Sequence, residues 1–331
     1  LEMRITEGPQ AHINSVRIYG NDRLYEEVVR RELQTKPGDL FSKEALMRSA
    51  REIASMGFFD PEKVNPDIKP NQEDGTVDIN WELEQKSNDQ VEFSLGWGQT
   101  GVIGRVSLKL NNFSMRNLFG RNKMHRGIMP IGDGEQLALS AQTNAQYYQS
   151  YSISYSAPWF NGKRPNAFNV GLFYSKQTDV NSNYYNNSWM NNYYSYYGGY
   201  GSYNGYYNNY ESYLDDDKYV QMLGASIGWG KRLRWPDDYF QLSLSLSYTR
   251  YMLRDWRYFL ISNGNCNNIN LGVTLSRVST DNQLFPRRGS EFMASLTITP
   301  PWSAFDKKDY EHLATDGTSA TFDQEQQDKY R

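Results

Sequence analysis

The sequence predicts a fold of two parts: a small α+β module with the element order βααββ, and an antiparallel transmembrane β-barrel truncated after about nine strands. Two observations predict it. Helical and alternating periods are mixed up to Lys86, whereas after Lys86 apolar and polar residues alternate in segment after segment. The chain also carries 26 Tyr, 15 Phe and 8 Trp, although its mean hydropathy is -0.76. Transmembrane barrels are polar on average because only alternate residues face lipid, and they carry aromatic belts.

The module contains two predicted helices between strands. Residues 1–10 are predicted to form a short strand that ends in a Gly-Pro turn, and a second strand begins at Ile13. Asn21 or Asp22 is expected to cap the first helix and Ser42 the second. The apolar positions at helical spacing are Leu24, Val28 and Leu33 in the first helix, and Leu46, Ala50, Ile53, Ala54 and Gly57 in the second.

The module ends in two predicted strands, residues 64–69 and 76–84, joined by a turn at Asp74-Gly75. Pro66 and Pro70 make the first of them an edge strand, because proline cannot donate to a ladder. The predicted edge-strand residues are Val64, Asn65, Asp67, Ile68 and Lys69. An edge strand can accept an incoming strand, although the prolines limit the bonds it offers, and it can equally be a protected edge that avoids aggregation.

The second part is predicted from nine alternating segments that share small polar residues on one face. They are residues 91–98, 105–110, 137–142, 151–157, 168–174, 223–230, 242–249, 269–276 and 292–298. A soluble β-sandwich would also alternate. The Ser, Thr, Gly and Asn faces favour a wet barrel lumen instead. Single-chain bacterial barrels have an even number of strands, so we expect more strands beyond Arg331.

The connections between these segments alternate in length. Short ones are predicted at 161–166, 235–238 and 285–290, and long ones at 177–217, 251–265 and after 300. Short periplasmic turns and long extracellular loops are typical of transmembrane barrels.

Charge, cysteine and histidine content argue against other classes of function. The 35 basic and 38 acidic side chains give a net charge of -3, so no nucleic-acid partner is expected. The single Cys266 forms neither a disulfide nor a metal cluster, and no metal or cofactor is predicted. No run of ~18 apolar residues is present, which excludes a transmembrane helix. The three histidines, His12, His125 and His312, lie in no triad or metal-ligand spacing.

One glycine-rich stretch needs separate treatment. Residues 224–231 are similar to a phosphate-binding loop, but they have one residue too many, Arg232 in place of Ser or Thr, and a strand pattern. We therefore expect that the chain is not an enzyme.

The order and spacing of several motifs resemble the POTRA-plus-barrel superfamily and, within it, the BamA family. In the module these are INSVRIYGNDRLYEEVVRREL, KPGDLFSKEALMRSAREIASMGFFD and GTVDINWELEQ. In the barrel they are LGWGQTGVIGRVSLKLNNFSMRNLFGRN, YSISYSAPWF and STDNQLFPRRGSEF. The last contains the family turn motif, Asp281, Asn282, Pro286 and Gly289. The resemblance implies the end of a preceding POTRA module at 1–10, a POTRA domain at 11–86 and the N-terminal part of the barrel at 87–331.

The resemblance also implies a function and a location. It implies assembly and insertion of β-barrel proteins in a Gram-negative outer membrane, with the POTRA module in the periplasm. The implied partners are nascent outer-membrane proteins, accessory lipoproteins or periplasmic chaperones, and outer-membrane lipid. The family's Arg-Gly pair on a later loop is not seen, and we expect it past residue 331. A two-partner secretion pore or a TamA-like protein, each exporting a dedicated substrate, is the alternative.

The first barrel strand carries the implied mechanism. In this family it pairs weakly with the last strand, opens sideways as a lateral gate and adds a substrate strand by main-chain hydrogen bonds. The residues concerned are Val91, Phe93, Leu95, Gly96, Trp97 and Gly98. Gly96 and Gly98 lower strand preference, which offers a reason for weak pairing. The sequence alone favours a different interpretation, small residues that fit a crowded lumen wall, as expected of Gly224, Gly228 and Gly230; the gate role rests on the resemblance.

The stretch 181–210 is almost entirely Asn, Tyr, Ser and Gly, a composition that builds no core of its own. It predicts a surface loop that is either without fixed structure or binds an extracellular partner through its tyrosines.

Overall fold

The structure is a computed structural model of the chain. It describes residues 10–71, 73–98, 101–119, 129–144, 147–160, 162, 164–180, 214–256, 258, 262–280 and 286–300. The predicted strand at 1–10 and the tyrosine-rich stretch 181–210 therefore lie almost wholly or wholly outside the described residues. The chain divides into two compact units, residues 1–90 with 109–137, and residues 91–108 with 138–331.

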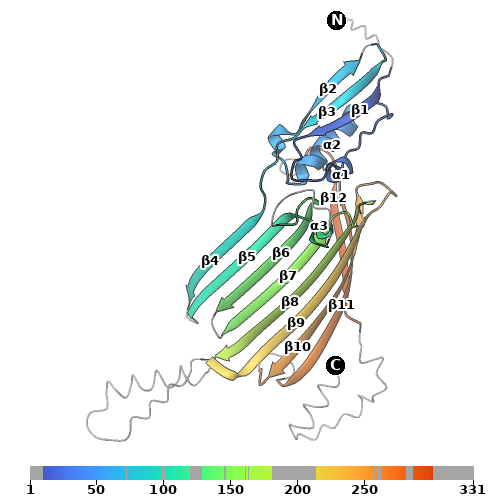
Figure 1. Cartoon of the computed structure of the whole chain (residues 1–331). Helices are drawn as coiled ribbons and strands as arrows, with labels where there is room; N and C mark the ends of the chain where they lie inside the picture. The colour runs from blue at the N-terminus through green and yellow to red at the C-terminus, as the bar shows by residue number, and fades with distance from the viewer. Residues whose placement is uncertain are drawn as a thin grey trace, which may run out of the picture. The chain divides into compact units, whose positions relative to one another are not determined.

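The module in the first unit has a three-stranded sheet and two helices. Its elements are β1 (His12–Tyr19), α1 (Glu26–Arg30), α2 (Lys43–Ser55), the short 3-10 helix η1 (Pro61–Lys63), β2 (Asn65–Asn71) and β3 (Thr76–Glu82). The sheet order is β1-β3-β2, with β1 parallel and β2 antiparallel to the central β3. The βααββ order is confirmed (Figure 1). Val64, expected in the edge strand, is instead buried just before β2 begins.

The second helix follows its sequence signals, whereas the first does not. The Ser42 hydroxyl caps α2 by accepting from the Ala45 amide at 3.3 Å, as predicted. The predicted cap of the first helix is wrong, because Asn21 closes a separate turn by donating to the Leu24 carbonyl. Leu33 lies beyond α1 in a tighter turn, where its amide bonds the carbonyl three residues back. No helix among the described residues is long and apolar enough to cross a membrane.

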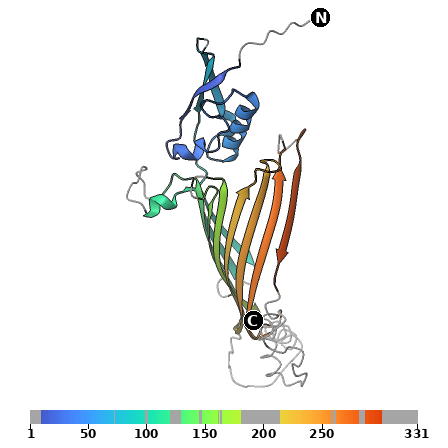
Figure 2. The ribbon, with the colours of Figure 1, turned by 90° about the vertical axis from the view of Figure 1, so that its right-hand side faces the viewer.

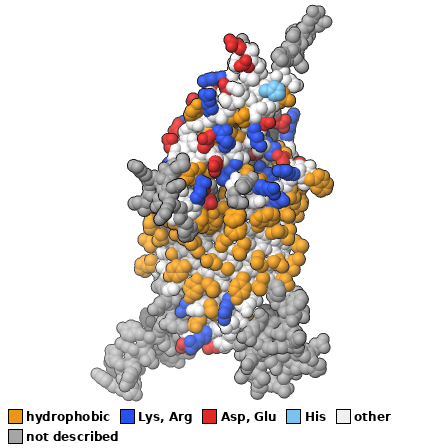
Figure 3. All heavy atoms as spheres, turned by 45° about the vertical axis from the view of Figure 1, so that its right-hand side comes forward, with side chains coloured by type: hydrophobic (Ala, Val, Ile, Leu, Met, Phe, Trp, Pro, Cys, Tyr) orange, Lys and Arg blue, Asp and Glu red, His pale blue; other side chains and the backbone are white. Residues whose placement is uncertain are grey.

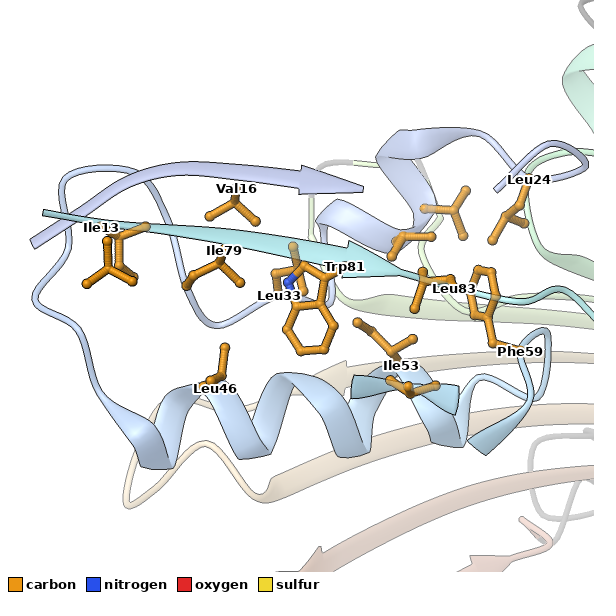
Figure 4. Close-up of a cluster of buried hydrophobic side chains, with 14 residues drawn as sticks. Ile13, Val16, Leu24, Leu33, Leu46, Ile53, Phe59, Ile79, Trp81 and Leu83 are labelled. Carbon is orange, nitrogen blue, oxygen red and sulfur yellow. The ribbon is translucent and has the colours of Figure 1, made fainter. Parts of the chain in front are cut away.

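The module's core lies between β3 and the two helices (Figure 4). Trp81 is fully buried at its centre, and Ile79 precedes it on the same face of β3. The other buried apolar members are Ile13, Val16, Leu24, Val28, Val29, Leu33, Leu46, Ile53, Phe59, Val64, Val77 and Leu83. The apolar positions expected for both helices therefore contribute to this core or pack against it, except Gly57, which lies past the end of α2 and outside the cluster.

The remaining strands form one antiparallel sheet. They are β4 (Gln90–Gly98), β5 (Gly101–Phe113), β6 (Glu135–Asn144), β7 (Tyr148–Ala157), β8 (Asn166–Val180), β9 (Leu214–Arg232), β10 (Phe240–Arg254), β11 (Gly264–Val278) and β12 (Glu291–Ile298). The nine-stranded order runs from β4 to β12 without a crossover. Figures 1 and 2 show the sheet strongly curved. Each of the nine predicted segments lies within one of these strands.

The two faces of the sheet differ as the alternation predicts. Hydrophobic side chains gather in a broad band over its outer surface (Figure 3). The other face pairs small residues across strands: Ser245 lies opposite both Gly228 and Gly272. Hydroxyls bond across it too, as between Thr274 and Ser295 at 3.0 Å.

The connections do not alternate between short and long as predicted. The connections predicted to be short, β7–β8 (158–165), β9–β10 (233–239) and β11–β12 (279–290), lie at one end of the sheet, but the last is longer than predicted. At the same end, β5 is joined to β6 by residues 114–134, which contain α3 (Met115–Phe119). At the other end, β4–β5 (99–100) and β6–β7 (145–147) are shorter than all of these. The predicted long loop at 251–265 shrinks to 255–263, because β10 and β11 continue pairing through their polar ends.

Candidate functional site

β4 is an edge strand of the large sheet. Among the strands that the structure describes, its one neighbour is β5. Its apolar row is correspondingly open: Val91, Phe93, Leu95 and Trp97 are 58%, 77%, 84% and 87% exposed. Outward residues of the interior strand β9 are better covered, with Leu223 at 49% and Ile227 at 50%. The difference follows because β4 and β12 are the two outer strands of the described sheet and each has a neighbour on one side; Leu296 on β12 is likewise 60% exposed.

Gly96, the glycine inside β4, has open space around it on the side of β5. A Cβ added to Gly96 would meet only the Ile103 side chain, at 4.0 Å. By contrast, a Cβ on Gly224 would lie 2.0 Å from the Phe173 ring, so that glycine is needed to fit its neighbour. Glycine within a strand costs roughly 0.5–1 kcal/mol relative to alanine. Gly96 is therefore not crowded by β5, its described neighbour, whereas Gly224 fits a crowded wall; Gly98 ends the strand.

The small sheet of the module has two outer strands, and one of them is covered. Along β1, the Ile13 amide donates to the Asp39 carbonyl at 2.9 Å, and the Ile13 carbonyl accepts from the Gly38 amide at 2.7 Å. The Arg30 guanidinium donates to the Val16 carbonyl at 3.3 Å. These contacts occupy main-chain groups that an incoming strand would need, so β2 is the more accessible edge.

The free edge of β2 is rich in acceptors. Pro66 and Pro70 lie opposite Trp81 and Val77 in an unbroken ladder with β3. Because proline has no N–H, the ladder donors must come from the alternate residues, and positions 66, 68 and 70 face outward. Of these, only Ile68 offers an N–H. The outward edge thus presents three carbonyls and one donor, which limits strand addition to a short stretch around Ile68.

Other predicted edge residues are exposed and partly paired. Asp67 and Lys69 form an ion pair at 3.2 Å within β2, and both side chains are largely exposed. Asn65 begins the strand opposite Glu82. An exposed pair of this kind contributes little to stability. These residues mark a polar, solvated edge.

The family turn motif is described in part. Asp281 and Asn282 lie outside the described residues. Gly289 has φ +101°, and a Cβ there would lie 2.2 Å from the Ser279 carbonyl oxygen, so the turn needs glycine. The Ser279 amide also donates to the Ser290 carbonyl at 3.0 Å, closing the turn on which Pro286 lies.

Arg277 links this turn to the neighbouring one, which the sequence analysis missed. Its guanidinium donates to Asp237 at 2.8 and 2.9 Å and to the Ser279 hydroxyl at 2.7 Å. Hydrogen bonds from Arg277 lower the pKa of Asp237 below its usual value. The arginine at the end of an apolar alternation was the available signal, since an outward charge there needs a partner.

The sequence analysis also missed a group of buried polar residues near the module. Asn111, Asn112, Ser114 and Asn117 are all less than a tenth exposed. Consecutive asparagines at the end of an apolar alternation were the signal, because buried amides require hydrogen-bond partners.

Two family models match this chain. The one described as POTRA, surface antigen variable number repeat, matches residues 11–86. The one described as Omp85 superfamily domain matches residues 131–328.

Parts of two curated relatives are similar to this chain. The chain is 33% identical to the outer membrane protein assembly factor BamA of Neisseria meningitidis over 37% of this chain and 15% of that protein. It is 27% identical to BamA of Nitratidesulfovibrio vulgaris over 35% of this chain and 14% of that protein. The matches thus span less than a fifth of these relatives.

A solved structure has the same fold. The structure of BamA from Haemophilus ducreyi lacking POTRA domains 1–3 matches with a TM-score of 0.51 and 18% identity. The match covers 89% of this chain and 49% of that one.

Proposed function

This chain belongs to the Omp85 superfamily, and on that premise we propose that it takes part in folding and inserting β-barrel proteins into a bacterial outer membrane. The observation that carries the proposal is a POTRA domain that leads directly into β4, the first strand of a nine-stranded antiparallel sheet that runs in chain order. The proposed activity needs no covalent chemistry. It is strand addition, in which main-chain hydrogen bonds supply the affinity.

The membrane environment supplies the driving force. An unpaired main-chain N–H or C=O in hydrocarbon costs several kcal/mol, because no water is present to bond it. A substrate strand that pairs with β4 satisfies the free groups of both strands at once. Its side chains would extend the apolar band over Phe93, Leu95 and Trp97. Gly96 keeps the intrinsic stability of β4 low, which favours exchange of one pairing for another.

We propose that the POTRA domain lies in the periplasm. The domain continues through Gln85–Asp89 into the start of β4, at the end of the sheet opposite the longest connection, residues 181–213 between β8 and β9. The longer loops of outer-membrane barrels are typically extracellular, so the opposite end, with the POTRA domain, is expected in the periplasm. This proposed topology places β2 where unfolded substrates and accessory proteins are met.

The proposed partners at β2 are extended segments of unfolded outer-membrane proteins, periplasmic chaperones or accessory lipoproteins. With three outward carbonyls and one amide, β2 suits brief contact with a short peptide. A long, register-fixed complex would need donors that Pro66 and Pro70 lack.

Depletion of the protein in its own host tests the proposal. Folded porins, which resist denaturation until heated, would be counted in the outer membrane. The proposal predicts a broad loss of folded barrels with unfolded precursors in the periplasm. Normal porins together with the loss of one secreted protein would contradict general assembly and indicate a dedicated secretion pore.

A further inference from the structure

The connection between β5 and β6 binds the POTRA domain around one residue, Tyr25, just before α1. The Tyr25 amide donates to the Gly132 carbonyl at 2.9 Å. Its hydroxyl donates to the Asn117 side-chain oxygen at 2.9 Å, and the Arg116 guanidinium lies 4.4 Å from the centre of its ring. Asp133 holds Arg116 in place through an ion pair at 2.7 Å. The main chain, ring face and hydroxyl of Tyr25 are therefore all engaged by residues far away in the sequence.

Two glycines let the connection approach this closely. Gly132 has φ +135°, and a Cβ there would lie 2.6 Å from the Tyr25 ring. Gly134 has φ +68°, and a Cβ there would lie 3.1 Å from Val28 and 3.3 Å from Phe58. A side chain at either position would require both a rare backbone conformation and displacement of the domain's apolar surface. The connection is thus fitted to the domain.

Asn112 joins the β5–β6 connection to the POTRA domain through its buried side-chain amide. Its oxygen accepts from the Gly132 amide at 3.2 Å and from the Gly134 amide at 3.1 Å, which shapes the connection. Its nitrogen donates to the Arg23 carbonyl at 2.6 Å, which lies in the POTRA domain. A buried amide that satisfies both ends in this way is costly to remove.

The residues that lead into β4 are held by the same group. The Asn111 amide donates to the Asp89 carboxylate at 2.9 Å, and the Asn111 side chain donates to the Asn88 carbonyl. The Asn88 side chain in turn donates to the Gly57 carbonyl at 2.9 Å, just past the end of α2. The lead-in to β4 is therefore bonded on one side to the domain and on the other to the end of β5.

We propose that Tyr25, Asn111, Asn112, Arg116, Asn117 and Gly132 form a clasp that fixes the lead-in of β4 to the POTRA domain. We further infer that they are positioning residues for strand addition at β4, an inference that rests on the proposed function. A strand held at one end loses less conformational freedom when it pairs with a newcomer, which speeds productive pairing. The clasp acts only by position, since none of its members lies on the β4 edge.

The Tyr25 amide gives a direct readout of the clasp, because its acceptor is Gly132. In the full-length protein in lipid vesicles, residue-resolved hydrogen exchange should show this amide protected. Gly132→Ala should make it exchange roughly tenfold faster, as expected when one hydrogen bond is lost, while the Ile79 amide in the core stays protected. Gly75→Ala is the matched control, because Gly75 also has positive φ, +62°, but an added Cβ meets nothing within 4 Å. An unprotected Tyr25 amide in the natural protein would overturn the clasp.

Insertion of a porin into the same vesicles tests the positioning role. Gly132→Ala should slow insertion about three- to tenfold, and Gly75→Ala should leave it unchanged. Tyr25→Phe, which keeps the ring beneath Arg116 and loses only the bond to Asn117, should fall between them and serves if Gly132→Ala does not fold. Faster exchange at Tyr25 with unchanged insertion would refute positioning. If the natural protein inserts no porin, the proposed function is wrong. Protection of the Tyr25 amide would still test whether the clasp forms.

Discussion

Replacing Gly20 with alanine should destabilise the POTRA domain at the point where β1 ends. Gly20 has φ +81°, and a Cβ there would lie 1.8 Å from the Leu83 carbonyl oxygen. The end of β1 and the segment after β3 are held together at this point, because the Leu83 amide donates to the Tyr19 carbonyl at 3.0 Å. Backbone must move, since neither partner atom belongs to a flexible side chain.

Three contributions add up to the expected loss in the free energy of unfolding. A positive φ costs alanine about 1 kcal/mol. Loss of the Leu83–Tyr19 hydrogen bond costs about 1 kcal/mol. Partial exposure of the buried Leu83 side chain adds about 1 kcal/mol. The free energy of unfolding of the domain should therefore fall by about 3 kcal/mol, which is on the order of a hundredfold in the opening equilibrium.

Hydrogen exchange of β1 and β3 amides in the full chain measures this change without isolating the domain. Gly75→Ala has positive φ but no clash, and should cost only about 1 kcal/mol. Equal acceleration by the two substitutions would refute the reasoning, because the close approach to Leu83 would then contribute nothing.

Two further predictions concern charged groups. Hydrogen bonds from Ser15 and Asn14 lower the pKa of Asp78 below its ordinary value of 3.8, so the folded domain favours the carboxylate. Its contribution to stability is present above pH 3.8 and is lost as the pH falls through the lower folded pKa. In Asp78→Asn, the urea concentration at the unfolding midpoint should therefore fall less steeply as the pH is lowered below 3.8. An unchanged fall would contradict this. Arg277→Lys should release Asp237, raise its pKa toward the usual value and speed protease cleavage in the turn near Gly289, whereas unchanged cleavage would show that the link between the turns is dispensable.

Much of the fold follows from local periodicity. Alternation located the nine strands of the large sheet because successive side chains of a strand point to opposite faces, so a one-sided apolar face gives an apolar residue at every second position. Helical spacing located the core positions of the domain, including Leu24 and Leu33. It could not locate the ends of α1, because tight turns at both ends place those two leucines in the core from outside the helix.

The clasp could not be predicted in this way. Tyr25 contacts Asn117 and Gly132, and no period in the sequence links positions so far apart. The connection at 114–134 shows no alternation, and its contacts depend on glycine main chain and on asparagine amides. Likewise, proline content predicted that β2 would be a poor edge, but only the register with β3 revealed that Ile68 is the one outward donor.

The central claim is that a substrate strand pairs with the edge of β4. It is tested most directly by disulfide trapping during porin insertion, with single cysteines placed along β4 at Phe93 and Leu95 in a Cys266→Ser background. Matching cysteines would lie along the last strand of the porin, and Leu172 on the interior strand β8 would be the control. The account predicts cross-links at β4 in a fixed register and none at Leu172. Cross-linking that is absent at β4, or equal at Leu172, would contradict it.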